Sequence, residues 1–204
     1  MGSNDVCGID KAQINKAGND EIGEEDCSNA DDFNKTLNDL RAKGKDAASE
    51  SSRQGDKLTG QDHKCAAANH EVAAVDTLKA KHPATTDRCG DAQRLYENAG
   101  KDRDYAAADA SVTGDEKMKA AKNAKNYKEA AKNYGEAARN GWKAHDDFKL
   151  AEGIAKKAGN NADAKEYRRL AGLAEAEAKK DNKAANAASA LEEKAEAHLK
   201  RPHQ

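Results

Sequence analysis

Small and apolar residues recur at alternating spacings of four and three along most of this chain, a pattern typical of helices that pack side by side. Ser28-Asn-Ala-Asp31 is typical of a helix N-terminus, and the proline of His82-Pro83 disfavours helix at the residue before it. The positions predicted to face a partner between these signals are Phe33, Leu37, Leu40, Gly44, Ala47, Ser51, Gln54, Leu58, Gln61, Cys65, Ala68, Val72 and Val75. We therefore expect a long helix over 28–82, weakest between Ser49 and Gly60.

Two further helical runs occupy the C-terminal half. Thr113-Gly-Asp-Glu116 matches a capping box and predicts a helix over 113–158. Gly159-Asn-Asn161 is a turn signal, after which another helix is predicted over 162–199. The predicted contact positions are Ala120, Ala124, Tyr127, Ala131, Tyr134, Ala138, Gly141, His145 and Phe148, followed by Ala164, Tyr167, Ala171, Ala174, Ala178, Ala185, Ala188, Ala195 and Leu199.

Residues 84–112 are less periodic, because Gly90 and Gly100 interrupt a short helical pattern. We expect them to form a small irregular or helical head at the end where the first helix turns over. The predicted fold class is all-α, an elongated bundle of three long helices stapled by two disulfides. Its expected order is a single domain over 1–200, with an N-terminal segment 1–27, helix 28–82, head 84–112, helix 113–158 and helix 162–199, then a tail 201–204.

The composition explains why this bundle should be narrow. Alanine fills 43 of the 204 positions, whereas Leu, Ile, Val and Phe together fill only 20. Low aliphatic content with high net charge would indicate disorder, but 35 basic and 37 acidic residues nearly cancel, so we expect an ordered chain. Alanine favours helix, and the consecutive heptads 126–132 and 133–139 share an Asn-Tyr-x-Glu-Ala-Ala pattern.

Several classes of function find no support in the pattern. Charges of both signs are mixed along the chain, so no basic block predicts a nucleic-acid partner. No apolar run of about 18 residues predicts a membrane span. No Ser/His/Asp arrangement, paired carboxylates or glycine-rich phosphate loop stands out, so we predict neither an enzyme nor a cofactor.

The four cysteines, Cys7, Cys27, Cys65 and Cys89, are widely spaced and include no Cys-x-x-Cys pair. This spacing does not match a zinc ribbon or a redox motif. An even number of cysteines in a chain with so few large apolar residues favours two disulfides and an oxidising compartment. Four free thiols in a cytosolic protein are the alternative.

Helix geometry restricts how these cysteines can pair. If 29–81 form one helix, Cys27 and Cys65 lie about 57 Å apart, whereas a disulfide needs Cα atoms within about 7 Å. Cys89 would lie past the far end of that helix, also out of reach of Cys27. The expected pairs are then Cys7–Cys27 and Cys65–Cys89. A break in the helix near Gly55 would leave all three connectivities open.

A few other residues are candidates for sites. Asn34-Lys-Thr36 is an N-glycosylation sequon, which makes Asn34 a candidate acceptor if it faces solvent. His63 and His70 would lie about 10.5 Å apart on a helix, too far to share a metal ion, so we interpret them as surface histidines. His145 is interpreted as a packed core histidine, and no metal site is predicted.

The remaining charged and aromatic clusters have structural interpretations. Asp146-Asp147 and Glu192-Glu193 are expected on solvated helix faces. Tyr127, Tyr134 and Trp142 recur at helical spacing and are expected to pack in the core.

With its Ala/Lys/Asn/Glu-rich helices at 28–82, 114–158 and 162–199 and its four cysteines in the N-terminal half, the chain resembles the alanine-rich helical surface proteins of trypanosomes. This group is typified by the glutamic acid/alanine-rich protein and is related to the haptoglobin–haemoglobin receptor and to variant surface glycoprotein N-terminal domains. The resemblance covers almost the whole chain and lies in pattern and composition rather than in a signature motif.

The resemblance implies a lipid-anchored coat glycoprotein on the outer face of the plasma membrane in an insect-vector life stage. It would have a structural, shielding or adhesive role, with its anchor signal beyond residue 200 and neighbouring coat proteins as partners. No catalytic residue is implied. Two alternatives are a surface receptor that binds a host or vector macromolecule through the head, and an intracellular stress-protective protein rich in alanine and lysine.

Overall fold

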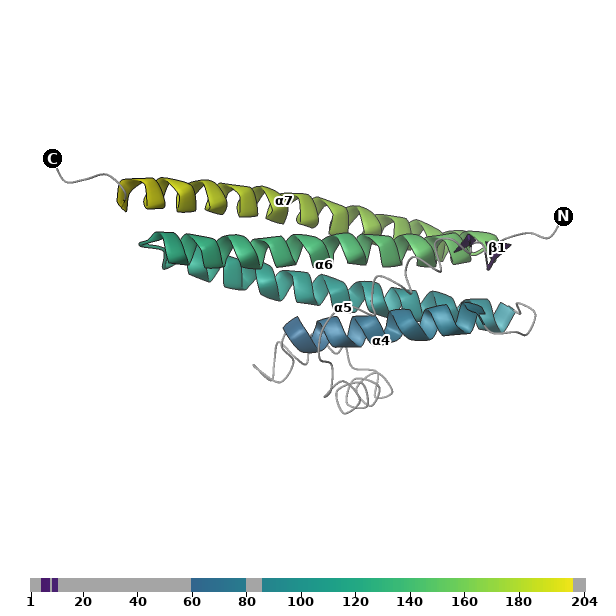
Figure 1. Cartoon of the computed structure of the whole chain (residues 1–204). Helices are drawn as coiled ribbons and strands as arrows, with labels where there is room; N and C mark the ends of the chain where they lie inside the picture. Colours follow the sequence, from purple (N-terminus) through teal and green to yellow (C-terminus); the bar gives the residue numbers. More distant parts are fainter. Residues whose placement is uncertain (1–4, 8, 11–59, 80–85, 200–204) are drawn as a thin grey trace.

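The computed structural model describes residues 5–7, 9–10, 60–79 and 86–199 (Figure 1). The elements are the strands β1 (Asp5–Val6) and β2 (Ile9–Asp10) and the helices α4 (Gly60–Lys79), α5 (Thr86–Lys119), α6 (Ala124–Lys157) and α7 (Asn161–Leu199). The two strands pair antiparallel as a minimal hairpin, with Val6 opposite Ile9. Apart from this short hairpin the described elements are helices, which confirms the predicted all-α class for the described part of the chain, but they are four helices and not the three long ones that were expected.

The four helices lie side by side in chain order and form an elongated antiparallel array (Figure 1). α6 packs along both α5 and α7, whereas the backbones of α5 and α7 come close at few positions and the two helices are joined by side-chain hydrogen bonds such as Tyr167 to Glu97. α4 packs mainly on α5, and β2 contacts α6. At about 1.5 Å per residue, the 39 residues of α7 extend for roughly 58 Å. α6 is thus the central helix on which the other elements assemble.

Glycine allows aromatic rings to enter the α5–α6 interface. A Cβ added to Gly100 would lie 2.8 Å from the Phe148 ring, and one added to Gly114 would lie 2.8 Å from the Tyr134 ring. Both distances are shorter than any ordinary van der Waals contact. The two largest aromatic side chains of the α6 contact face therefore occupy the space that these glycines leave.

Apolar burial is uneven along the array. The main cluster joins α4, α5, α6, α7 and Cys7 through Ala74, Val75, Leu78, Ala92, Tyr96, Ala144, Phe148, Ala151, Ile154, Ala155, Ala164, Tyr167, Ala171 and Ala174. A smaller cluster, toward the opposite end, contains the buried residues Ala130, Tyr134 and Ala188. The end of the array at which α6 meets α7 is consequently the better packed.

The expected head at 84–112 is wrong, because residues 86–119 form the single helix α5. Gly100, which seemed to interrupt the pattern, instead receives the Phe148 ring. The expected helix start at Thr113 is wrong as well. The Thr113 hydroxyl donates to the Asp109 carbonyl at 3.0 Å, one turn earlier in the same helix, so it does not cap a new one.

The turns on either side of α6 have clear local causes. Asn123 caps the N-terminus of α6 by accepting a hydrogen bond from the Asn126 amide at 3.1 Å. The predicted turn at Gly159 is confirmed: Gly159 adopts a φ of +76° just after α6, and the Asn160 amide donates to the Ala155 carbonyl at 2.9 Å. Asn160 then accepts from the Asp163 amide at 3.2 Å, which caps α7.

The predicted contact faces of α6 and α7 are confirmed in part, since Ala120 is exposed and precedes α6. Tyr134, Ala138, Gly141 and Phe148 are buried on α6, and Ala164, Tyr167, Ala171, Ala174, Ala178 and Ala188 are buried on α7. Trp142 and Leu199 depart from the prediction, with 39% and 80% of their surface exposed. Tyr127 and His145 are only partly buried.

The contact face of α4 is rotated by one residue from its predicted position. Val72 was expected inside, but it is 42% exposed, whereas Glu71 is buried. Among the α4 residues whose side chains are described, the buried ones are His63, Ala66, Ala67, Glu71, Ala74, Val75 and Leu78. The rest of the first predicted helix, over 28–59, lies outside the described residues.

Candidate functional site

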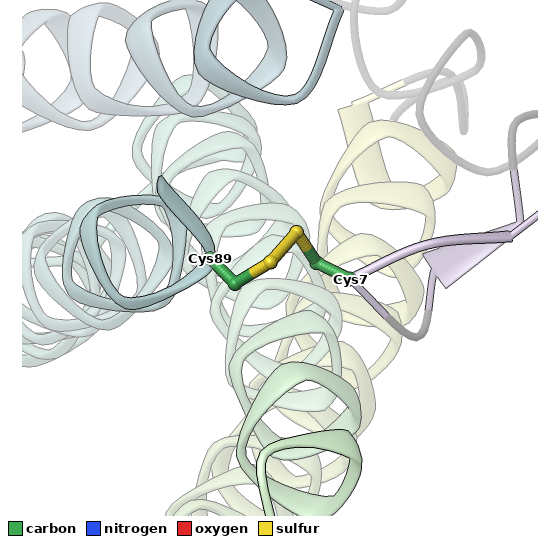
Figure 2. The surroundings of a disulfide bond; sticks show 2 residues. All are labelled: Cys7 and Cys89. Carbon is green, nitrogen blue, oxygen red and sulfur yellow. A yellow bond between two sulfur atoms is a disulfide. The ribbon is translucent and has the colours of Figure 1, made fainter. Parts of the chain in front are cut away.

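A disulfide joins the N-terminal hairpin to the first turn of α5 (Figure 2). Cys7 and Cys89 are 82 residues apart in sequence, and their Cα atoms lie 5.5 Å apart. Cys7 directly follows β1 with a φ of 54°, the left-handed conformation found in tight hairpin turns. The turn therefore presents the Cys7 sulfur to α5.

The expected pairs Cys7–Cys27 and Cys65–Cys89 are both wrong, because Cys7 is bonded to Cys89. Cys65 lies 14 residues before the end of α4, while Cys89 lies three residues after the start of the antiparallel α5. These positions differ by more than 15 Å along the helix axes at about 1.5 Å per residue, which excludes the second pair. Cys27 and the sequon residue Asn34 lie outside the described residues.

A second unusual feature is a cluster of buried charges where α4 meets α5 and α6. Arg103 of α5 donates from Nε to Glu71 Oε1 at 3.0 Å and from Nη2 to Glu71 Oε2 at 3.4 Å. Its Nη1 donates to Asn140 Oδ1 of α6 at 3.3 Å. All three side chains are buried. One guanidinium group thus links three helices, since its planar fork can bond several acceptors at once.

Asp147 of α6 adds a second buried carboxyl group to this cluster. Burial raises the pKa of Asp147 well above its usual range, and the charge of Glu71 and a hydrogen bond with Glu71 raise it further, against the opposing effect of Arg103. The protonated form of Asp147 is therefore favoured more strongly than in an exposed aspartate, and it hydrogen-bonds with Glu71. We call Glu71, Arg103, Asn140 and Asp147 the buried polar cluster.

Tyr96 is the aromatic neighbour of this cluster. It is fully buried, and its hydroxyl has no hydrogen-bond partner among the described residues. Burial, followed by the charges of Asp147 and Glu71, raises its pKa above the ordinary range. The phenol consequently stays neutral beside the two carboxyl groups.

Two histidines of α4 approach one carboxylate of α5, so the surface interpretation is wrong for His63, which is buried, and for His70, which is mostly buried. His63 Nδ1 lies 3.4 Å from Asp102 Oδ1, and His70 Nε2 lies 3.6 Å from Asp102 Oδ2. The two rings, two turns apart on α4, therefore reach the two oxygens of one aspartate. Lys64 adds a polar contact to α6, donating to Glu136 at 2.6 Å.

The expectation that Asp146-Asp147 lies on a solvated face is correct for Asp146 and wrong for Asp147. Sequence reasoning also missed the paired carboxyl groups of Glu71 and Asp147, because they lie 76 residues apart. One signal was present: Asp147 continues the seven-residue spacing of Asn126, Asn133 and Asn140. Polar residues thus recur along one stripe of α6.

This arrangement links α4 to α5 and α6 through carboxyl groups and a guanidinium that are all buried. In the described part of the chain, no group of three or more His, Cys, Asp or Glu side chains is placed to hold a metal ion. None of the helices described is long and apolar enough to cross a membrane. No protein-family model, characterised protein or solved structure matches the chain.

Proposed function

We propose that this chain is the outer part of a non-enzymatic, lipid-anchored cell-surface coat protein with a structural, shielding or adhesive role. The observation that carries the proposal is the Cys7–Cys89 disulfide, since such bonds persist in oxidising environments and are rare in the cytosol. The resemblance to trypanosome surface proteins points to the same role and to an insect-vector life stage.

The arrangement of the elements supports the proposal. The hairpin that bears Cys7 and the C-terminal end of α7 lie at opposite ends of the array (Figure 1). A lipid anchor attached after α7 would therefore place the disulfide at the end far from the membrane. A row of antiparallel helices, narrow because its contacts are mostly alanine, suits dense packing with neighbouring coat proteins.

The two alternatives have less support. A receptor was expected to use an irregular head at 84–112, but residues 86–119 form a helix packed along α6. An intracellular stress-protective protein would not need a disulfide between segments so distant in sequence.

Surface labelling on intact cells tests the proposal. In cells that naturally produce the protein, a membrane-impermeant amine biotinylation reagent should label it before lysis, while a cytosolic enzyme in the same cells stays unlabelled. Phosphatidylinositol-specific phospholipase C should release it into the medium. Labelling only after lysis, together with free Cys7 and Cys89 thiols, would contradict the proposal.

A further inference from the structure

Three basic side chains converge on one buried carboxylate near the junction of α6 and α7. Glu152 of α6 is only 1% exposed. Its oxygens accept hydrogen bonds from Lys149 Nζ at 2.6 Å and Arg168 Nε at 2.8 Å, and Lys156 Nζ lies 2.6 Å from Oε1. Burial opposes ionisation of Glu152, but these three contacts outweigh it and lower its pKa to about 2. We call these four residues the Glu152 cluster.

The cluster has more positive charge than the carboxylate needs. A buried carboxylate requires a cationic partner and hydrogen bonds, and a single cation would neutralise it. Here three cations surround one anion, so the cluster keeps a net charge of +2. The surrounding segment 149–169 contains six basic and three acidic residues, although the whole chain has a net charge of −2. Its other two acidic residues bind other partners: Asp163 accepts from Gln93 and Asn160, and Glu166 accepts from Arg169.

The excess charge faces solvent. The side chains of Lys149, Lys156 and Arg168 are 47%, 50% and 64% exposed, while Glu152 lies beneath them. Within the described residues, Arg168 uses only its Nε to bind Glu152, which leaves both Nη groups to donate outward. Each lysine ammonium has two further N–H donors.

We propose that the Glu152 cluster binds a tetrahedral oxyanion, a sulfate or a phosphate group. The guanidinium fork of Arg168 matches two oxygens of such a group, and the lysines supply point charges beside it. A doubly charged anion would balance the net charge of the cluster. The buried carboxylate already holds the three side chains together, so binding loses little side-chain entropy. This proposal does not depend on the proposed function.

Titration with inorganic anions, followed by NMR amide shifts of the isotope-labelled full chain, tests the proposal. Sodium sulfate and sodium phosphate are added separately, and sodium chloride at matched ionic strength serves as the reference. Either or both oxyanions should produce saturable shifts within 149–156 and 165–169, and chloride should not. A preference between sulfate and phosphate identifies the bound group.

Two neighbouring arginines provide a matched pair of variants. Arg168→Ala should weaken oxyanion binding about tenfold or more, because it removes charge-assisted hydrogen bonds, while Lys149 and Lys156 still neutralise Glu152. Arg169→Ala removes the same charge from the next position, where Arg169 pairs with Glu166, and should change affinity less than twofold. Arg168→Lys should lose several-fold affinity, since it keeps the charge but not the fork.

Two results would overturn the proposal. One is the absence of saturable shifts with both sulfate and phosphate. The other is an equal loss of affinity in the Arg168→Ala and Arg169→Ala variants, which would show that only overall charge attracts anions. The amide spectrum of each variant shows whether its fold is intact, so a folding defect is distinguishable from a binding defect.

Discussion

Gly100 has no side chain, and this leaves room for the Phe148 ring in the α5–α6 interface. A Cβ at this position would lie 2.8 Å from Phe148 Cε1, and Phe148 is fully buried between α5 and α6. We expect Gly100→Ala to destabilise the protein by about 1–3 kcal/mol, because overpacking costs more than the helix propensity that alanine adds. The change in the free energy of unfolding is measured by urea denaturation.

The control for this substitution lies on the same helix. Nothing lies within 4 Å of a Cβ at Gly90, so Gly90→Ala should be neutral or stabilising by up to about 1 kcal/mol. Equal changes in the free energy of unfolding for the two substitutions would show that the packing of the Phe148 ring does not require a glycine at position 100.

Asp104 predicts a pH dependence of stability. Burial, followed by the charge of Glu177, raises its pKa to about 6 in the folded protein. Between the ordinary aspartate pKa and pH 6, the folded chain holds a proton that the unfolded chain has lost, so stability falls as pH rises through this window. The stability that comes from protonated Asp104 is fully present below the ordinary aspartate pKa and is lost above about pH 6.

Asp104→Asn should therefore flatten the stability profile between pH 4 and 6.5. We expect the variant to gain about 1–2 kcal/mol relative to the wild type across that range, a value reduced for partial solvent exposure. Asp147 and Asp181 have raised pKa values as well, so the comparison is made between profiles of the two proteins.

At the scale of the helices, periodicity predicted α6 and α7 well because alanine and tyrosine mark one face of each. Prediction failed for α5, where the contact face includes glycines. Gly100 and Gly114 could be interpreted only when Phe148 and Tyr134 were placed opposite them. The local sequence does not distinguish a glycine that makes room for an aromatic ring of another helix from a glycine that ends a helix.

The buried charges were beyond sequence reasoning for a related reason. Val72 is the more apolar residue and was expected inside, but Glu71 is buried because Arg103 and Asp147 supply its partners from α5 and α6. The disulfide partner of Cys7 depended in the same way on the position of α5. The burial of Glu71 and the Cys7–Cys89 bond both depend on contacts between segments distant in sequence, whereas the helices themselves follow from local sequence patterns.

The Cys7–Cys89 bond predicts how the hairpin and the start of α5 respond to reduction. Reduction, or Cys89→Ser, should lower the free energy of unfolding by about 2–4 kcal/mol, because the bond closes a loop of 82 residues. Urea denaturation with and without reductant measures this loss. Amide hydrogen exchange should increase first in residues 86–92.

Peptide mapping under non-reducing conditions checks the connectivity. It should recover Cys7 and Cys89 in one linked pair of peptides. With these two joined, a second disulfide within the chain can form only between Cys27 and Cys65. Recovery of Cys7 linked to Cys27 would contradict the structure.

In the whole molecule, stability should be graded from α6 outward. α6 packs against both long neighbours, whereas α4 is the shortest of the helices that the structure describes and packs mainly on α5. Much of the buried face of α4 is ionisable, with Glu71 linked to Arg103 and with His63 and His70 beside Asp102. When one partner of such a contact is lost, the other group stays buried without a compensating charge, and this is strongly destabilising. α4 should therefore detach as a unit before the other helices open.

Arg103→Leu tests this order, because it removes the cation that links α4 to α5 and α6. Glu71 and Asp147 would then share a buried site without a counter-charge, at a cost of about 3–5 kcal/mol. Native-state hydrogen exchange should show residues 60–79 losing protection while 124–157 keep it. Arg94→Ala, whose partner Asp91 is exposed, should change neither region. Uniform loss of protection across α4 and α6 in the Arg103 variant would instead mean that the four helices open together, with the buried polar cluster stabilising the whole array and not α4 alone.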